Sequence, residues 1–142
     1  MKSILLTVFC IFTTHLVRAE IDPAAIMQDM EVCKNDTKMS DEEFSELMAQ
    51  QMPKSPEGKC FIFCMMRSMT LMSEEGELNS EGCSAMIAEA PIDDDQKEKM
   101  KGMPEECAKE VKIVKEDPCE TAYRISLCFQ KKAEERGIEG PM

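Results

Sequence analysis

The sequence predicts an all-α protein with about six short helices in one domain. Three observations lead to this prediction. Helix-start signals, in which Ser or Asp precedes a segment with apolar residues at helical spacing, recur along the chain. No segment shows the alternation of apolar and polar residues that is typical of a half-buried strand. An apolar N-terminal leader is followed by seven cysteines, a combination typical of small secreted domains cross-linked by disulfides.

Residues 1–19 have the features of a secretory signal peptide. Lys2 precedes an apolar run that is too short to span a membrane, and a small-residue cleavage pattern ends at Ala19. We therefore expect a secreted, extracellular protein of residues 20–142, with no stable insertion into a membrane.

Two helices are predicted in the first part of this region. The Asp-Pro pair at residues 22–23 predicts a helix to about Asn35, because Asp caps a helix and Pro fits its first turn. A capping box of Ser40 and Glu43 predicts a second helix over residues 41–52, which ends before a proline.

The third segment is predicted to be the central helix. A Ser-Pro pair at residues 55–56 opens it, and residues 60–72 are almost wholly apolar. A helix that is apolar on most sides is buried on most sides. Within it, Met65, Met69 and Met72 follow each other at i, i+4 and i+7, and so form one predicted stripe.

Three start signals follow in the second half of the chain. Ser80 predicts a short helix that ends before a proline, and Asp93 begins a helix that is interrupted at Gly102 and resumes near Glu105. An Asp-Pro pair at residues 117–118 caps the last helix. The charged tail, residues 131–142, is expected to be flexible and to fray.

Six cysteines have a distinctive spacing. Successive gaps of 26, 3, 42, 11 and 8 residues separate them. They are Cys33, Cys60, Cys64, Cys107, Cys119 and Cys128. Cys60 and Cys64 lie at i, i+4, so they share a helix face and can clamp two different neighbours. The residues alone leave the pairing open, because six cysteines allow 15 connectivities.

This spacing resembles the six-cysteine pattern of insect odorant-binding proteins, the pheromone- and general-odorant-binding superfamily. The C-x3-C and C-x8-C steps are its most specific marks. The resemblance implies a helical shell around an apolar cavity, a carrier function for small apolar odorant- or pheromone-like ligands, and a membrane receptor as a candidate partner. The disulfides that it implies are Cys33–Cys64, Cys60–Cys119 and Cys107–Cys128.

The amino-acid composition fits a hollow interior. Of the 14 methionines, all but Met1 lie beyond the leader, and the chain has no tryptophan. Methionine is flexible and polarizable, so as a set these residues suggest a pocket wall that repacks around different guests. An empty apolar pocket of about 300 Å³ would cost about 7 kcal/mol. Three disulfides at roughly 2–4 kcal/mol each can offset that cost.

The predicted ligand-binding residues come from these methionines and from Ile87, which lies beside Met86 in a stripe of the next predicted helix that could face the central one. The resemblance implies further wall residues in the segment after Cys64 and just after Cys128. Tyr123 is added as a hydrogen-bond donor to a ligand carbonyl or hydroxyl. The set is Met65, Met69, Leu71, Met72, Met86, Ile87, Met100, Met103, Tyr123 and Phe129.

Charge and histidine content exclude several functions. Cleavage removes Lys2 and Arg18, so that 15 basic and 28 acidic residues remain and the net charge is −13. This charge repels the phosphates of nucleic acids and of anionic membranes. The one histidine, His15, lies in the leader. After cleavage the chain can therefore form no catalytic triad, zinc site or pH switch that needs a histidine. We therefore expect no enzymatic activity, no metal and no cofactor.

A rival hypothesis is a secreted interaction protein, such as a defence protein or a salivary effector, with its function on the surface and its interior filled. We expect a monomer or a weak homodimer. Cys83, outside the six-cysteine pattern, is either a buried small hydrophobe, a reactive thiol or half of an intermolecular disulfide. Asn35 heads a formal N-glycosylation sequence whose occupancy stays open.

Overall fold

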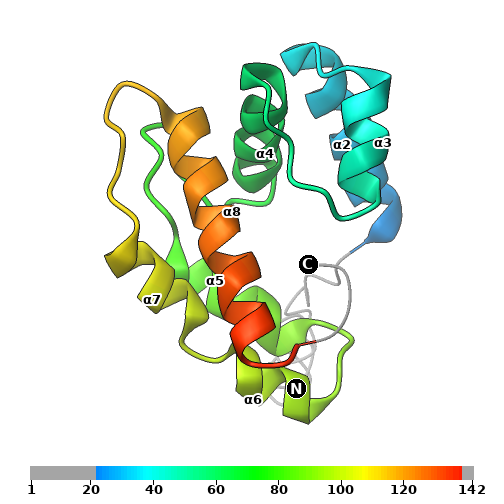
Figure 1. The fold of residues 1–142 in the computed structure, drawn as a ribbon. Helices are drawn as coiled ribbons and strands as arrows, with labels where there is room; N and C mark the ends of the chain where they lie inside the picture. Colours follow the sequence, from blue (N-terminus) through cyan, green and yellow to red (C-terminus); the bar gives the residue numbers. More distant parts are fainter. Residues whose placement is uncertain (1–21, 139–142) are drawn as a thin grey trace, which may run out of the picture.

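The computed structural model describes residues 22–138, and in this range the chain forms seven α-helices and no strand (Figure 1). The predicted leader, its cleavage site and the last four residues lie outside the described range. The helices are α2 (Pro23–Thr37), α3 (Asp41–Met48), α4 (Pro56–Ser68), α5 (Ser80–Glu89), α6 (Asp94–Met100), α7 (Met103–Glu110) and α8 (Pro118–Glu135). The predicted all-α class is confirmed.

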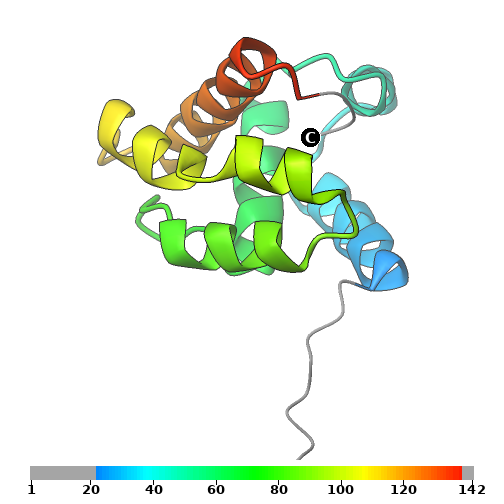
Figure 2. The ribbon, with the colours of Figure 1, turned by 90° about the horizontal axis from the view of Figure 1, so that it is seen from below.

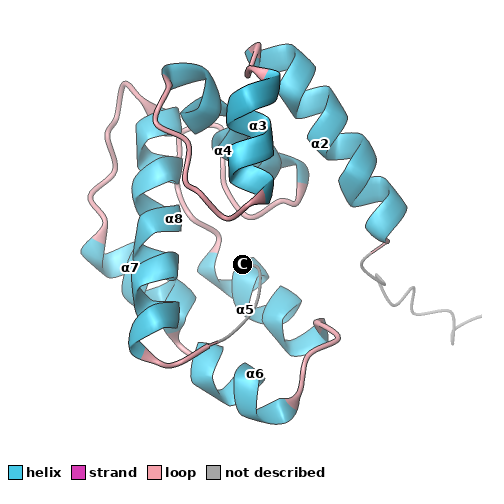
Figure 3. Ribbon diagram, turned by 45° about the vertical axis from the view of Figure 1, so that its right-hand side comes forward, coloured by secondary structure: helices cyan, strands magenta, loops and turns pink. Residues whose placement is uncertain are grey.

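Helix α4 lies at the centre of the arrangement. It packs against α8 on one side and against α2 on the other (Figures 1 and 3). Helices α5, α6 and α7 form the other end of the molecule, where α5 packs on α6 and α7, and α7 packs on α8 (Figure 2).

The capping residues act as the sequence predicts at five helix starts. Each side chain accepts a hydrogen bond from a backbone N–H in the first turn, as in Asp22, Ser40, Ser55, Asp93 and Asp117. The cap of α5 differs from the prediction, because Asn79 and not Ser80 accepts the bond, from the backbone N–H of Gly82 at 2.9 Å. The amide of Asn79 also donates to the carbonyl of Thr70 at 3.1 Å, which anchors the helix start to the preceding turn.

Two predicted helices are too long. Helix α3 ends at Met48 because Gln50 adopts a left-handed backbone conformation, with φ of 65°. Helix α4 ends at Ser68 because Thr70 does the same, with φ of 57°. The N–H of Leu71 then donates to the carbonyl of Met66 at 2.8 Å, a bond that closes the helix end.

The segment after α4 is therefore extended rather than helical. Met72 forms an isolated antiparallel bridge with Leu78, and the N–H of Asn79 donates to the carbonyl of Leu71 at 2.8 Å. The prediction that Met65, Met69 and Met72 form a stripe on one continuous helix is therefore wrong, because only Met65 lies within α4.

The predicted interruption near Gly102 separates α6 from α7, and Gly102 has a φ of 76° that favours glycine. Helix α8 runs on to Glu135, into the segment that we expected to fray. Arg136 explains this continuation: its guanidinium donates to both carboxylate oxygens of Glu106 at 2.7 Å and to the backbone carbonyls of Lys99 and Lys101.

Three disulfides tie the helices together, and they are the pairs that the resemblance implies. Cys33–Cys64 joins α2 to α4, Cys60–Cys119 joins α4 to α8, and Cys107–Cys128 joins α7 to α8. Their Cα–Cα distances are 5.7, 4.5 and 5.9 Å, within the usual range for disulfides.

We predict that the chain of residues 20–142 carries one free thiol, that of Cys83. Alkylation in denaturant without a reducing agent should add one label, as counted by intact mass, and reduction before alkylation should raise the count to seven. Two or more labels without reduction would contradict the disulfide pattern, and a covalent dimer with no label would assign Cys83 to an intermolecular bridge.

Candidate ligand-binding site

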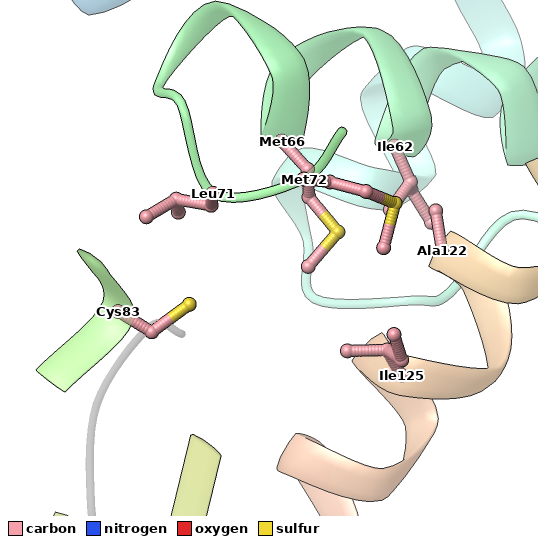
Figure 4. Close-up of a cluster of buried hydrophobic side chains, with 7 residues drawn as sticks. All are labelled: Ile62, Met66, Leu71, Met72, Cys83, Ala122 and Ile125. Carbon is pink, nitrogen blue, oxygen red and sulfur yellow. The ribbon is translucent and has the colours of Figure 1, made fainter. Parts of the chain in front are cut away.

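Most of the buried apolar side chains of the described residues fall into two clusters. The larger, which we call the central cluster, joins α4, the segment after it, α5 and α8 (Figure 4). It consists of Ile62, Met66, Leu71, Met72, Cys83, Ala122 and Ile125. The smaller, the N-terminal cluster, is formed by Cys33, Met39 and Phe61.

Half-buried apolar side chains surround the central cluster. They are Met52, Phe63, Met69, Leu78, Met86, Val111, Tyr123 and Phe129. Because these side chains are packed on one side and exposed on the other, they can move without breaking the buried core. This edge is thus a continuous border of half-buried apolar side chains around the buried core.

The structure divides the predicted ligand-binding residues among several places. Met69, Met86, Tyr123 and Phe129 lie at the edge of the central cluster. Leu71 and Met72 lie inside it, with 6% and 5% of their surface exposed. Met103, at the start of α7, is almost fully buried.

Met65 belongs to a different place from the other methionines of its region. It packs against the N-terminal cluster, whereas Met66 and Met69 belong to the central cluster or its edge. Adjacent positions on a helix point about 100° apart, so the two neighbouring methionines of α4 face different clusters.

Sequence reasoning missed Phe63. This ring packs at the edge of the central cluster, and the guanidinium of Arg67 lies 5.7 Å from the ring centroid. The signal was present in the sequence: Phe63 precedes Met66 by three residues, so helical spacing places both on neighbouring parts of one face.

The ring of Tyr123 lies against the ammonium of an ion pair. The ammonium of Lys59 is 4.7 Å from the centroid of the Tyr123 ring, and the same ammonium donates to Glu120 at 2.7 Å. This contact links the N-terminal turn of α4 to α8.

A cleft of about 750 Å³ opens between α5, α6 and α7, apart from both clusters. Ile87 and Met100, both in the predicted set, supply part of its apolar wall. Charged side chains from α6 line its other side, among them Asp94, Lys97 and Glu98. This cleft is thus more polar than the edge of the central cluster.

Cys83 is part of the core. Its side chain belongs to the central cluster, and 4% of its surface is exposed. Burial, followed by the negative charge of Glu105, raises the pKa of the Cys83 thiol to about 11. At neutral pH the group is a protonated thiol, which favours the interpretation of Cys83 as a buried small hydrophobe.

Paired carboxylates stabilise the frame around these sites. Hydrogen bonds from Lys132 and then Arg136 hold the pKa of Glu106 below its ordinary value. Hydrogen bonds from Lys59 and then Arg124 lower the pKa of Glu120 in the same way.

Glu43 is a third carboxylate whose pKa is lowered by its hydrogen bonds. Burial alone would raise the pKa of Glu43, but hydrogen bonds from Ser55 and the backbone of Lys54 outweigh this effect and lower it. The contact joins α3 to the start of α4, where Gly58 is needed: a Cβ there would lie 2.4 Å from the Cβ of Pro53.

Two features are absent from the described residues. Within residues 22–138, no three histidine, cysteine or acidic side chains are arranged so as to hold a metal ion. None of the helices in that range combines the length and the apolar character that a membrane crossing requires.

The chain is similar to known proteins both in sequence and in structure. Residues 20–132 match the PBP/GOBP family. General odorant-binding protein 19d of Drosophila melanogaster is 29% identical over 109 residues, which cover 75% of this chain and 71% of the relative.

Two solved structures share the fold. Odorant-binding protein 28a of Drosophila melanogaster superposes with a TM-score of 0.70 at 23% identity, over 82% of this chain and 95% of that one. Odorant-binding protein 7 of Anopheles gambiae, which has four disulfide bridges and was solved in complex with an azo compound, gives a TM-score of 0.60 at 24% identity. That likeness covers 82% of this chain and 91% of the mosquito protein.

We predict that the Cys83 thiol reacts very slowly in the folded protein. Its pKa of about 11 leaves roughly two orders of magnitude less thiolate at pH 8 than an ordinary cysteine has, and burial blocks access as well. A colorimetric thiol assay without denaturant measures the rate. The Met48→Cys variant, altered at an exposed position of α3, is the control and should release one rapid equivalent. An equally rapid equivalent from the unaltered protein would contradict the prediction.

Proposed function

Because the chain belongs to the PBP/GOBP family, we propose that it is a secreted carrier of small apolar ligands. It takes up an odorant- or pheromone-like molecule in an internal pocket, moves it through aqueous extracellular fluid, and delivers it to a membrane receptor. The family is one of odorant-binding proteins, and an apolar guest is the ligand that the interior of this chain suits.

The observation that carries the proposal is the half-buried edge of the central cluster. Met69 and Met86 contribute flexible side chains to this edge, and Phe63 and Phe129 contribute rings. Methionine side chains change rotamer at low cost and keep favourable contacts with aromatic rings. A guest can therefore enter by displacing these side chains from one another while the buried residues stay in place.

The Anopheles relative, which was solved with an azo compound, supports this ligand class. An affinity in the micromolar range, about −8 kcal/mol, is within reach of such a site. Burial of about 400 Å² of apolar ligand surface yields about 10 kcal/mol at 25 cal/mol per Å², before the costs of association are subtracted.

A second candidate function is that of a secreted interaction or effector protein on the same scaffold. Met27 and Val32 on α2 favour it, because 61% and 49% of their surfaces are exposed and apolar side chains of this kind can meet a partner protein. Binding of an apolar fluorescent probe separates the two functions. A carrier takes up one probe per chain and releases it to a competitor, whereas a filled effector does not.

We predict that Met69→Lys and Phe129→Lys abolish uptake of an apolar fluorescent probe while the helical circular dichroism is kept. Each substitution places an ammonium at the edge of the central cluster, where a bound apolar guest would have to bury it. The measurement is a probe titration with displacement by an unlabelled ligand.

Two matched controls carry the same new charge elsewhere. Met48→Lys alters an exposed methionine of α3, and Leu127→Lys alters an exposed position of α8 close in sequence to Phe129. Both should titrate like the unaltered protein. Normal uptake in both edge variants would contradict the proposed position of the pocket.

We predict that probe affinity is nearly constant from about pH 7.5 to 5.5 and falls below about pH 5. No histidine lies in residues 20–142, so the usual sensor in that upper window is absent. The lowered pKa values of Glu43, Glu106 and Glu120 mean that these carboxylates stabilise the fold fully above their unfolded pKa, near 4.3. Their contribution is lost as the pH falls through their folded pKa values.

Titrations at fixed ionic strength across this range test the prediction, with thermal unfolding measured on the same samples. Affinity and stability should fall together below about pH 5. A tenfold loss of affinity centred near pH 6 would contradict it and would point to another titrating group.

A further inference from the structure

The chain has two asparagines, and the fold uses the side chain of one of them. Asn79 accepts a hydrogen bond from the N–H of Gly82 and donates one to the carbonyl of Thr70, and so holds the start of α5. The side-chain amide of Asn35, in the last turn of α2, has no partner among residues 22–138. Asparagine is also a poor helix former, so the contacts of the fold do not account for Asn35.

Asn35 begins the sequence Asn-Asp-Thr, the acceptor motif for N-linked oligosaccharides in secreted proteins. Asn79 does not begin such a motif, because the residue two positions after it is Glu81. The chain therefore contains a single acceptor motif, and it falls on the asparagine whose side chain the fold leaves unused.

Asn35 lies on the face of α2 that is turned away from the rest of the protein. Successive residues of a helix are about 100° apart, so Asn35 lies about 200° around the helix from Cys33. Cys33 is 2% exposed and is bonded to Cys64 of α4, so the opposite face of α2 is turned to solvent. Asn35 and Asp36 are both exposed, and α2 lies at the rim of the molecule (Figure 3). A bulky group attached to Asn35 therefore extends into solvent.

The order of synthesis leaves the motif accessible on the growing chain. Cys64, which fixes α2 through the disulfide with Cys33, comes 31 residues after it in the chain. Until then α2 is an isolated helix of 15 residues, a length that is only marginally stable in water. In the folded protein the hydroxyl of Thr37 donates to the carbonyl of Cys33 at 2.7 Å. Because that bond depends on the folded helix end, both polar groups of the motif are free while the chain is being made.

We propose that Asn35 is an N-glycosylation site, modified before the Cys33–Cys64 disulfide fixes α2. The donor is an oligosaccharide linked through a diphosphate to a polyisoprenoid lipid of the secretory membrane. The side-chain nitrogen of Asn35 forms a bond to C1 of the first sugar, while the bond from C1 to the phosphate oxygen breaks. The lipid diphosphate leaves with the electron pair of that bond, and the amide nitrogen gives up one proton. The inference rests on the secretory route of the proposed function.

An oligosaccharide on Asn35 also covers an apolar side chain. Val32 lies three residues before Asn35, at a neighbouring position on the helix surface, and is 49% exposed. Side chains of a helix lean toward its N-terminus, so the first sugars lie over the turn that contains Val32. The modification therefore fits a carrier better than an effector that binds a partner protein through Val32.

The first test expresses the full chain in insect cells and compares intact masses of the secreted protein. The unaltered protein should carry one oligosaccharide, and a peptide N-glycosidase should release it and convert Asn35 to aspartate, which peptide mass spectrometry locates. Asn35→Gln alters an exposed side chain without a partner, so it should fold normally and lack the oligosaccharide. If the secreted unaltered protein has only the mass of its polypeptide, the proposal is overturned.

The second test uses two substitutions of Thr37, which leave Asn35 in place. Thr37→Ser keeps the hydroxyl and the acceptor motif, so the oligosaccharide should be retained. Thr37→Val keeps the volume of the side chain and removes the hydroxyl, so the oligosaccharide should be lost. An oligosaccharide that persists in Thr37→Val, or one that is attached elsewhere than at Asn35, would overturn the proposal.

The same samples keep this inference separate from the carrier function. Uptake of the apolar fluorescent probe should be equal in Asn35→Gln and in the unaltered protein, because α2 contributes none of the described residues of the central cluster or its edge. If the probe fails to bind at all, the carrier proposal is wrong, while the masses still decide the glycosylation site. If the full chain stays inside the cells, the secretory route is wrong, and residues 20–142 behind an unrelated secretory leader decide the glycosylation site alone.

Discussion

The fold depends on two cysteines that lie one turn apart on α4. The disulfide of Cys64 joins α4 to α2, and that of Cys60 joins α4 to α8, so the central helix is covalently held to the neighbours on both of its sides. The Cys107–Cys128 bond extends this frame to α7. Each closed loop restricts the unfolded chain and is worth roughly 2–4 kcal/mol. Helices as short as α3 and α6 need such a frame, because isolated helices of their length are unstable in water.

A covalent frame also changes what the interior must do. When cross-links supply a large share of the stability, the apolar side chains need not be packed to the highest density, and a partly open edge is tolerated. The central cluster illustrates this: its buried residues come from α4, the segment after it, α5 and α8, while Met69, Met86 and Phe129 stay half exposed around them. Flexible side chains in that position suit guests of varying shape.

Two surfaces of different polarity are thus present in the described residues. The edge of the central cluster relies on shape and apolar area, which favour a range of guests over a single one. In the cleft between α5, α6 and α7, the carboxylate of Glu105 accepts a hydrogen bond from the hydroxyl of Ser84, and charged side chains of α6 lie beside it. The ion pairs of Arg136 and Lys132 with Glu106 tie the end of α8 to α7 and so keep that side of the molecule together.

The sequence by itself determined the all-α class and five of the seven helix starts in residues 22–138, because a cap such as Asp22 or Asp117 acts on backbone groups within three residues of itself. Together with the family resemblance, the cysteine spacing also led to the disulfide pairs. Only the tertiary structure decided that α4 stops at Ser68 and that its neighbouring methionines face different clusters. These features depend on contacts between residues far apart in the chain, and local patterns of propensity and spacing hold no record of such contacts.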